Sequence, residues 1–459
     1  MGVAAMTATL AVLLRNAAAP AQLAVRRVAP FFPCAGVLSR RALLAMGLAA
    51  AVVAAPLASA PVHAMGAPGQ PKTGPGGSDY TIAATDIEKK VFGEGNGRAL
   101  AFFPRGAATK PRPVVVFLHA PGAISPSWYG AWLEHLTRRG NVVIYPLYEE
   151  TIGAVPYEEM TGEALKGVRA ALAGLAAMPD VKADASSLSF LGHSGGGIIA
   201  ANLAALSGRD ELPPARLLFG AMPARGGAEK IYAPPLANLA SMPAKTVAIM
   251  LVGDRDSVAG DRGARQILTA AGHLGQDHRL IAKAGSDNHG LPAVFYSHQA
   301  AVAPNEDWDL AKIPGAAPVA AGPAAAGGKP AAGKTAEGAP KLTPQEARQQ
   351  REEQRKRNAA LWRVGYEERR GLAGYEGRTV GAGNYAIWKV FDLAMDTVTA
   401  GGDAMTLKRD PRLYDMGLWS DGWPLRRLSV ETPKPVVHKD GQEVSQGAPA
   451  AAGAVRGAR

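Results

Sequence analysis

Cysteine is almost absent from this sequence: the single one among 459 residues is Cys34. A chain with one cysteine cannot form an internal disulfide, and a metal site built from several thiolates is excluded. Cys34 also lies within an N-terminal segment that we interpret below as an export signal, so the mature protein would have no cysteine nucleophile. Its stability must come from a hydrophobic core, for which a hydrophobic content of 47% is ample.

Acidic residues are absent from the first 64 residues, which contain five arginines and supply almost half of the net charge of +11. Within this segment Arg40 and Arg41 precede an apolar run over 42–57, and an A-x-A-like cleavage sequence ends at Ala64. This order is typical of an export signal, and the arginine pair resembles that of bacterial twin-arginine signals. We predict an exported protein, periplasmic or extracellular. An uncleaved anchor and an organellar transit peptide are the alternatives.

Several kinds of residue cluster are also missing. No group of Lys and Arg is interleaved with aromatic residues, so nucleic-acid binding is not expected. No pair of histidines has the spacing of metal ligands, so we expect no metal site. The apolar run at 42–57 is too short for a stable membrane span, and none is expected after signal cleavage. Glu149 and Glu150 are interpreted as solvent-exposed charges.

From residue 80 onward, apolar segments of strand length alternate with helical patterns. Continuous apolar runs are typical of strands that are buried on both faces of a parallel sheet. The alternation predicts an α/β fold with right-handed crossovers, in which a mostly parallel sheet has helices on both faces. The expected strands are 80–87, 98–105, 113–122, 141–148, 188–194, 216–223, 245–256 and 278–290, and the expected helices include 128–139 and 157–178.

Composition divides the chain into segments. Around 314–340 the sequence is reduced to Ala, Gly, Pro and Lys, which cannot bury enough apolar surface to fold. The predicted organisation is an export signal at 1–64, a linker at 65–79, a domain core at 80–313, a disordered insertion at 314–342, C-terminal helices with a Trp-Ser-Asp-Gly segment that packs on the core at 343–431, and a disordered tail at 432–459.

The segment "LSFLGHSGGGIIAANLAA", residues 188–205, changes abruptly from a strand pattern to a helix pattern at Ser194. A serine raised on such a turn needs small residues two positions before and after it, and Gly192 and Gly196 meet that need. The turn would expose the Ser194 hydroxyl, and the N-terminus of the following helix would face developing negative charge. We therefore predict that Ser194 is a nucleophile.

A nucleophilic serine requires a base and an acid that orients the base. Asp256 closes "MLVGDRD" at the end of one expected strand, and His289 closes "AGSDNHG" at the end of the next. The order serine, acid, histidine is that of the α/β-hydrolases. We predict a triad of Ser194, Asp256 and His289.

Other residues could take these roles. Asp254 is the alternative acid. Asp287 is interpreted as a residue that would instead orient the loop of His289. His193 is expected to be structural. The other histidines that could act as the base are His273, His278 and His298, for which surface or packing roles are expected because they do not close a strand.

An oxyanion formed at Ser194 needs two backbone N–H donors. One is expected from Gly195, the residue after the nucleophile. The other is expected from the loop after the 113–118 strand, where Pro121 has no N–H. The predicted donor is Ala123, with Gly122 as the alternative.

These motifs resemble the α/β-hydrolase superfamily, and in particular bacterial dienelactone hydrolases, lipases and polyester hydrolases. The resemblance implies an eight-stranded sheet, the triad named above, and hydrolysis of esters or lactones without a cofactor. The sequence departs from the family pattern at His119-Ala120, where the family commonly has His-Gly. The segments that carry the resemblance are 113–148, 188–205, 246–258 and 280–292.

We therefore predict a serine hydrolase that forms an acyl-enzyme on Ser194, with a small-molecule or polymeric ester as its substrate. Two alternatives are a non-catalytic binding protein of the cell envelope with the same fold, and an acyltransferase with the same triad. Trp419 and Trp423 are interpreted either as a flap beside the pocket or as packing residues.

Overall fold

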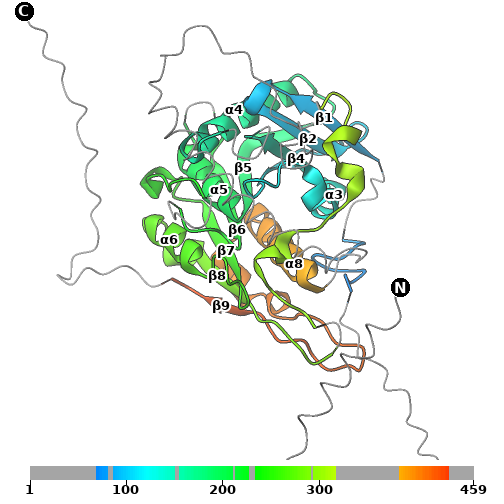
Figure 1. Ribbon diagram of the computed structural model, residues 1–459, viewed down its shortest axis with the longest axis vertical. Helices are drawn as coiled ribbons and strands as arrows, with labels where there is room; N and C mark the ends of the chain where they lie inside the picture. Colours follow the sequence, from blue (N-terminus) through cyan, green and yellow to red (C-terminus); the bar gives the residue numbers. More distant parts are fainter. Residues whose placement is uncertain are drawn as a thin grey trace, which may run out of the picture. The chain divides into compact units, whose positions relative to one another are not determined.

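The computed structural model describes residues 69–80, 86–149, 155–209, 212–226, 233–290, 293–316 and 382–433 (Figure 1). The predicted export signal, the predicted insertion beyond residue 316 and the predicted tail beyond residue 433 lie outside these residues. Export therefore stays a prediction. In the part of the chain that the structure describes, no helix combines the length and the apolar composition needed to cross a membrane.

A mixed sheet of nine strands forms the centre of the described residues, and its strand order is β1-β2-β4-β3-β5-β6-β7-β8-β9. The six strands from β4 to β8 in this order are parallel, whereas β1, β2 and β9 pair antiparallel with their neighbours. The predicted α/β fold is thus confirmed, with nine strands in place of the eight expected. The strands are β1 Ile87–Phe92, β2 Arg98–Pro104, β3 Arg112–Leu118, β4 Val142–Leu147, β5 Ala183–His193, β6 Ala215–Ala221, β7 Val247–Gly253, β8 Arg279–Ala284 and β9 Ser429–Glu431.

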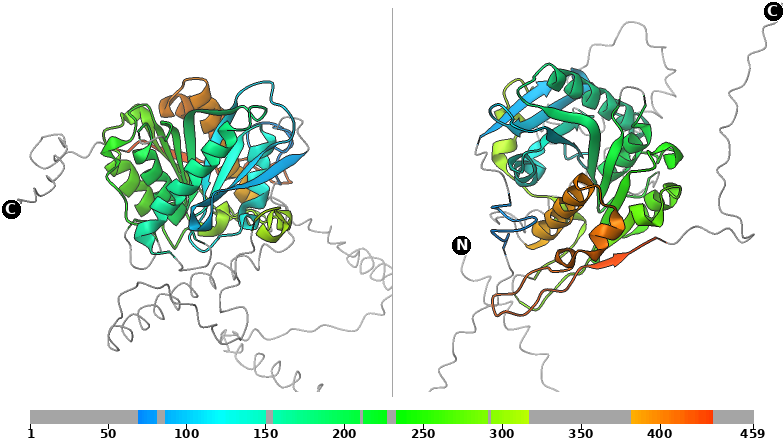
Figure 2. Two further views of the ribbon diagram at one scale, coloured as in Figure 1. Left: turned by 90° about the horizontal axis from the view of Figure 1, so that it is seen from above. Right: turned by 180° about the vertical axis from the view of Figure 1, so that it is seen from behind.

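Helices cover both faces of the sheet (Figures 1 and 2). One face packs against α4 (Tyr157–Ala176), α5 (Gly195–Leu206) and α6 (Arg262–Ala270). The other face packs against α3 (Gly130–Arg138), α8 (Ala382–Thr399) and α9 (Ala404–Arg409). The last two helices come from the C-terminal segment that the sequence predicts to pack on the core.

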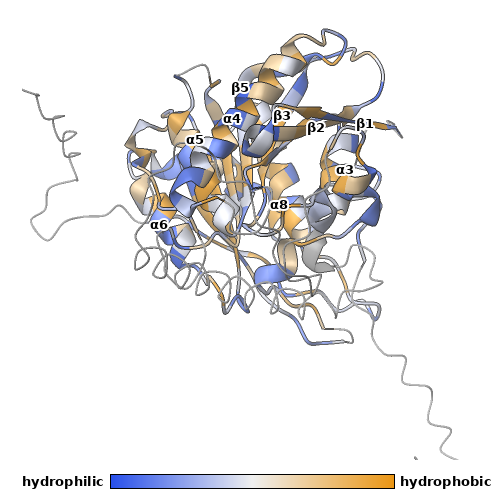
Figure 3. Cartoon of the chain, turned by 45° about the horizontal axis from the view of Figure 1, so that its top comes forward, coloured by the Kyte–Doolittle hydropathy of each residue, from blue (hydrophilic) through white to orange (hydrophobic). Residues whose placement is uncertain are grey.

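The strands supply both core layers by alternation. In β3, Val116 faces the α5 layer and Phe117 faces the α8 layer, and in β5 the same division separates Phe190 from Leu191. All four side chains are fully buried. Burying one such side chain contributes about 1.5–3 kcal/mol. Figure 3 shows the hydrophobic colouring concentrated on the strands and on the inner sides of the helices.

A buried ionic network holds the described part of the predicted linker, residues 69–79, against α8. Asp392 of α8 is fully buried and accepts hydrogen bonds from His135 Nε2 at 2.8 Å, Arg139 Nη1 at 2.8 Å and the Gly76 amide at 2.7 Å. Burial raises the pKa of Asp392, but the charges of His135 and Arg139 and these hydrogen bonds hold it below its ordinary value. The carboxylate is therefore ionised and joins α3, α8 and the N-terminal segment.

Candidate active site

Ser194 lies at the turn between β5 and α5, at the carboxyl edge of the parallel strands. Its backbone has φ 55° and ψ −125°, a conformation that residues with a side chain rarely adopt. Such backbone strain costs about 1–3 kcal/mol and persists only where surrounding contacts enforce it. The Ser194 amide donates to the carbonyl of Ala221, and the Ser194 carbonyl accepts from the amide of Ala224. The turn predicted from the sequence is present.

Two glycines make this turn sterically possible. A Cβ at Gly192 would overlap the carbonyl group of Gly196, and a Cβ at Gly196 would overlap the carbonyl oxygens of Leu118 and His119. The neighbouring strand β3 thus passes too close to α5 for any side chain at Gly196. This explains why the sequence has glycine at both positions.

The side chains of Ser194, His298 and Asp256 form one hydrogen-bonded line. His298 Nε2 lies 2.8 Å from Ser194 Oγ, and His298 Nδ1 lies 3.0 Å from Asp256 Oδ2. His298 begins the short 3-10 helix η5 (His298–Ala301), and Asp256 follows β7. All three residues are buried, with exposed fractions of 7% or less.

Asp256 is held as a carboxylate. Its second oxygen, Oδ1, accepts hydrogen bonds from the amides of Val258 at 2.9 Å and Ala259 at 2.8 Å. Burial raises the pKa of Asp256, but the hydrogen bond and charge of His298, together with these two amides, keep the pKa below its ordinary value. The ionised Asp256 accepts the proton on His298 Nδ1, and this orients His298 Nε2 toward the Ser194 hydroxyl.

The structure corrects the predicted base: the imidazole at Ser194 belongs to His298, not to His289. His289 lies in the loop after β8, where its Nε2 is 2.8 Å from Asp421 Oδ2. Its ring stacks on Trp423 with a centroid distance of 5.3 Å and an interplanar angle of 15°. His289 therefore interacts with the C-terminal segment rather than with the nucleophile.

The path of the chain after β8 explains the error. The expectation was that the base would close the strand, but the chain first forms an excursion in which Asp287 pairs with Val294. It returns to the sheet edge at Tyr296, whose carbonyl accepts from the amide of Arg255, and His298 follows. The local sequence does not give the length of this excursion, so it offers no reason to prefer His298 to His289.

The alternative acids and bases lie elsewhere. Asp254 accepts hydrogen bonds from the amide and hydroxyl of Ser286 and so contacts the loop after β8. Asp287 accepts from the amide of His289, the orienting role that the sequence left open for it. His273 bonds to the carbonyl of Met242, and His278 bonds to its neighbour Asp277.

The two predicted oxyanion donors differ in their surroundings. Gly195 is the first residue of α5, so its amide has no acceptor within the helix. The Ala123 amide, by contrast, donates to the carbonyl of Ala120 at 2.9 Å and closes a tight turn. This corrects the Ala123 prediction, because its N–H is already used within its own loop.

The alternative donor, Gly122, is engaged as well. Its amide donates to Glu149 Oε1 at 2.5 Å. Glu149 is 1% exposed, so its interpretation as a solvent-exposed charge is wrong. Its carboxylate instead anchors the loop after β3, beside the nucleophile turn.

The two tryptophans of the C-terminal segment have different environments. Trp419 is buried in the core, and Trp423 is 59% exposed and covers His289. The Trp419 amide donates to the carbonyl of Trp423, and Leu418 pairs with Pro424, so the segment forms a hairpin. The packing interpretation therefore holds for Trp419, and Trp423 lies on the surface.

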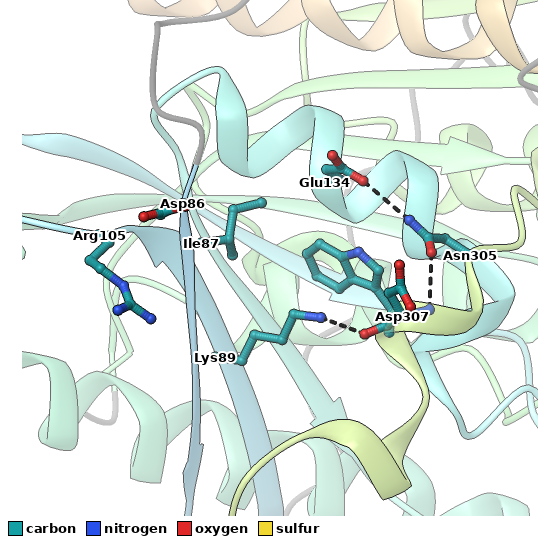
Figure 4. Close-up of a pocket in the computed structure, with 8 residues that line it drawn as sticks. Asp86, Ile87, Lys89, Arg105, Glu134, Asn305 and Asp307 are labelled. Carbon is teal, nitrogen blue, oxygen red and sulfur yellow. Dashed lines mark hydrogen bonds between the residues drawn. The ribbon is translucent and has the colours of Figure 1, made fainter.

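A separate pocket lies beside the edge strand β1 (Figure 4). Its volume is about 440 Å³, and its polar groups bond to one another: Lys89 Nζ donates to the carbonyl of Asp307 at 2.7 Å, and Asn305 donates to Glu134 at 3.2 Å. Lys89 also lies over the ring of Trp308, 4.2 Å from its centroid. The residues of the triad do not line this pocket, and we assign it no chemistry.

The mostly parallel sheet, the strained serine turn and the hydrogen-bonded Ser–His–Asp line define a hydrolase of the α/β-hydrolase type. Residues 79–254 match the family model described as Chlorophyllase. Over these residues the chain is similar to the chlorophyllase family, and together with the site this identifies it as a carboxylic ester hydrolase of the α/β-hydrolase type. The superfamily predicted from the sequence is thus confirmed, whereas the finer resemblance to dienelactone, lipase and polyester hydrolases stays a prediction.

The matched residues contain the nucleophile turn and the loop after β3, and they end before Asp256 and His298. A search of curated proteins found no match to the chain.

Proposed function

We propose that the protein cleaves carboxylic esters, or lactones, through an acyl-enzyme on Ser194, with His298 as general base and Asp256 as the acid that orients it. One observation carries this proposal: His298 bonds to Ser194 Oγ at 2.8 Å and to Asp256 at 3.0 Å within the buried sheet edge. These distances are within the range required for direct proton transfer.

In the first half of the reaction, Ser194 Oγ attacks the ester carbonyl carbon while His298 Nε2 takes the hydroxyl proton. The negative charge of the tetrahedral intermediate moves to the former carbonyl oxygen, and the Gly195 amide stabilises it. Imidazolium His298 then gives its proton to the departing alcohol oxygen, which leaves the acyl group on Ser194. Ionised Asp256 stabilises the imidazolium and holds its ring in place.

In the second half, water replaces the alcohol. His298 takes a proton from water, the resulting oxygen attacks the acyl carbon, and the proton returns to Ser194 Oγ as the carboxylic acid departs. Losing one amide donor of an oxyanion site typically raises the barrier by about 2.7–4 kcal/mol. The proposed cycle needs no group other than the protein's own side chains, backbone amides and water.

The proposed substrate is a small-molecule or polymeric carboxylic ester. The family description, Chlorophyllase, refers to an enzyme that acts on chlorophyll, which is a carboxylic ester. Chlorophyll is therefore one member of the substrate panel. The acyl and alcohol parts that the protein prefers would be defined by p-nitrophenyl esters of graded acyl length.

The test is mass spectrometry of the purified protein after reaction with a fluorophosphonate probe, with Ser194→Ala as the control. A single adduct on Ser194, absent from the control, together with ester hydrolysis that Ser194→Ala loses, is the expected result. An unlabelled Ser194 in a folded protein, or equal ester hydrolysis by both proteins, would overturn the proposed mechanism.

A further inference from the structure

His193 immediately precedes the nucleophile and is almost fully buried, with an exposed fraction of 1%. It contacts groups on two other segments of the site. Its Nδ1 lies 2.8 Å from the Tyr129 hydroxyl, and its Nε2 lies 2.9 Å from the backbone carbonyl oxygen of His298. Tyr129 ends the 3-10 helix η2 (Pro126–Tyr129), which follows the loop after β3.

The direction of each hydrogen bond follows from the acceptors. A carbonyl oxygen only accepts, so His193 Nε2 carries the proton and donates to His298. Nδ1 of the neutral ring is then an acceptor and receives the Tyr129 hydroxyl proton. The Tyr129 oxygen in turn accepts from the Ala120 amide at 3.1 Å. One chain of hydrogen bonds thus joins the loop after β3, the nucleophile turn and the base.

Burial of His193 keeps its ring neutral. Burial, and after it the charge of His298, lower the pKa of His193 to about 3. The two rings are close, with centroids 5.2 Å apart. A neutral His193 can therefore lie beside His298 without repelling the imidazolium that forms there when Ser194 loses its proton.

His298 lies outside the strands of the sheet. It begins a 3-10 helix of four residues, outside the strand ladder that fixes Ser194. Its ring must nevertheless lie within hydrogen-bonding distance of two partners at once. A displacement of about 1 Å at such a group can reduce the rate about 100-fold.

We propose that His193 is a positioning residue for the base: its Nε2–H group holds the backbone of His298, and Tyr129 holds the ring of His193. This inference rests on the proposed function, because it assigns His193 a task only if His298 acts on Ser194. His193 itself does not touch the reacting atoms. Its contribution is to keep His298 Nε2 aligned with Ser194 Oγ.

The experiment compares His193→Gln with His193→Leu. Glutamine can place an amide N–H near the position of Nε2 and so keep the donor to His298, whereas leucine fills space without a donor. His273→Gln is the matched control, because His273 also bonds to a backbone carbonyl, that of Met242, outside the site. For each purified protein, kcat and KM for p-nitrophenyl butyrate and the thermal midpoint would be measured.

The expected result is that His193→Leu lowers kcat about 10- to 100-fold with KM changed by less than about twofold, as for a misaligned catalytic group. His193→Gln should recover most of that loss, and His273→Gln should retain wild-type kcat. Tyr129→Phe should lower kcat by a smaller factor, and it provides the test if His193→Leu does not fold.

Two results would overturn the inference. The first is wild-type kcat in folded His193→Leu or, if that variant does not fold, wild-type kcat in Tyr129→Phe. The second is an equal loss of kcat in His193→Gln and His193→Leu. The proposed function fails in a different way, through a wild-type protein whose ester hydrolysis survives Ser194→Ala. The two failures are therefore distinguished within one set of proteins.

Discussion

Replacing His298 by alanine removes the one imidazole that contacts both Ser194 and Asp256. Replacing His289 by alanine removes an imidazole of similar position in the sequence, which instead contacts Asp421 and Trp423. The two substitutions delete the same atoms from positions that both follow β8 in the chain. Their comparison isolates the contribution of the contact with Ser194.

The general contribution of a positioned base sets the size of the expected difference in kcat/KM. A positioned general base contributes about 10²- to 10⁴-fold, which corresponds to about 3–5.5 kcal/mol of barrier. Because His298 serves both halves of the proposed reaction, we expect His298→Ala to lower kcat/KM at least about 1000-fold. His289→Ala should change kcat/KM by less than about threefold, as expected for a surface substitution away from the reacting groups.

The assay is hydrolysis of p-nitrophenyl butyrate at pH 8, with the thermal midpoint of each variant as the control for folding. The rate of Ser194 labelling by a fluorophosphonate should fall in parallel in His298→Ala, since the same base activates the serine. A folded His298→Ala protein with near wild-type activity, or a large loss in His289→Ala alone, would refute the assignment of the base.

Three further predictions concern the turn, the acid and a buried lysine. Gly196→Ala should lower stability by about 1–3 kcal/mol, because its methyl group would overlap carbonyl oxygens at the end of β3, and should abolish labelling; thermal melting and the probe test this. Asp256→Asn should retain the fold but lower kcat about 10⁴-fold, since an amide holds the wrong tautomer of the base; kinetics and circular dichroism test this. Lys389→Met should stabilise the protein at pH 7 by up to about 3 kcal/mol, because burial lowers the pKa of Lys389 from 10.5 to about 8 and so penalises its charged form in the folded state. That gain in stability should be complete below pH 8 and should disappear as the pH rises toward 10.5. Chemical denaturation at several pH values would measure it, and a gain that is unchanged between these pH values would contradict the prediction.

The sheet and the strained turn at Ser194 could be predicted from the sequence because both depend on local patterns. Continuous apolar runs such as 113–118 are typical of strands that are buried on both faces of a parallel sheet, so each strand can be recognised without knowing its neighbours. The turn at Ser194 requires glycine at fixed distances along the chain, and that requirement is visible in the letters alone. The acid, Asp256, could be predicted because it directly follows its strand.

The histidine beside Ser194 and the hydrogen bonds of the loop after β3 depend on contacts between distant segments. The loop after β8 leaves the sheet edge and returns before His298, and nothing in the sequence gives the length of that excursion. The burial of Glu149 could not be predicted because its carboxylate is paired with the Gly122 amide, 27 positions earlier in the chain. Such pairings are fixed by the fold, and local composition does not report them.

The helices α8 and α9 follow all three residues of the Ser–His–Asp line in the sequence. α8 lies against β6, β7 and η5, and its Phe391 packs on Phe219 of the sheet with ring centroids 5.3 Å apart. Without α8 and α9, the part of the sheet that they cover would be exposed and η5 would lose its contact with α8, although Ser194, Asp256 and His298 would all be present. The proposed ester hydrolysis is therefore expected to require that these two helices are docked, even though neither carries a residue of the Ser–His–Asp line.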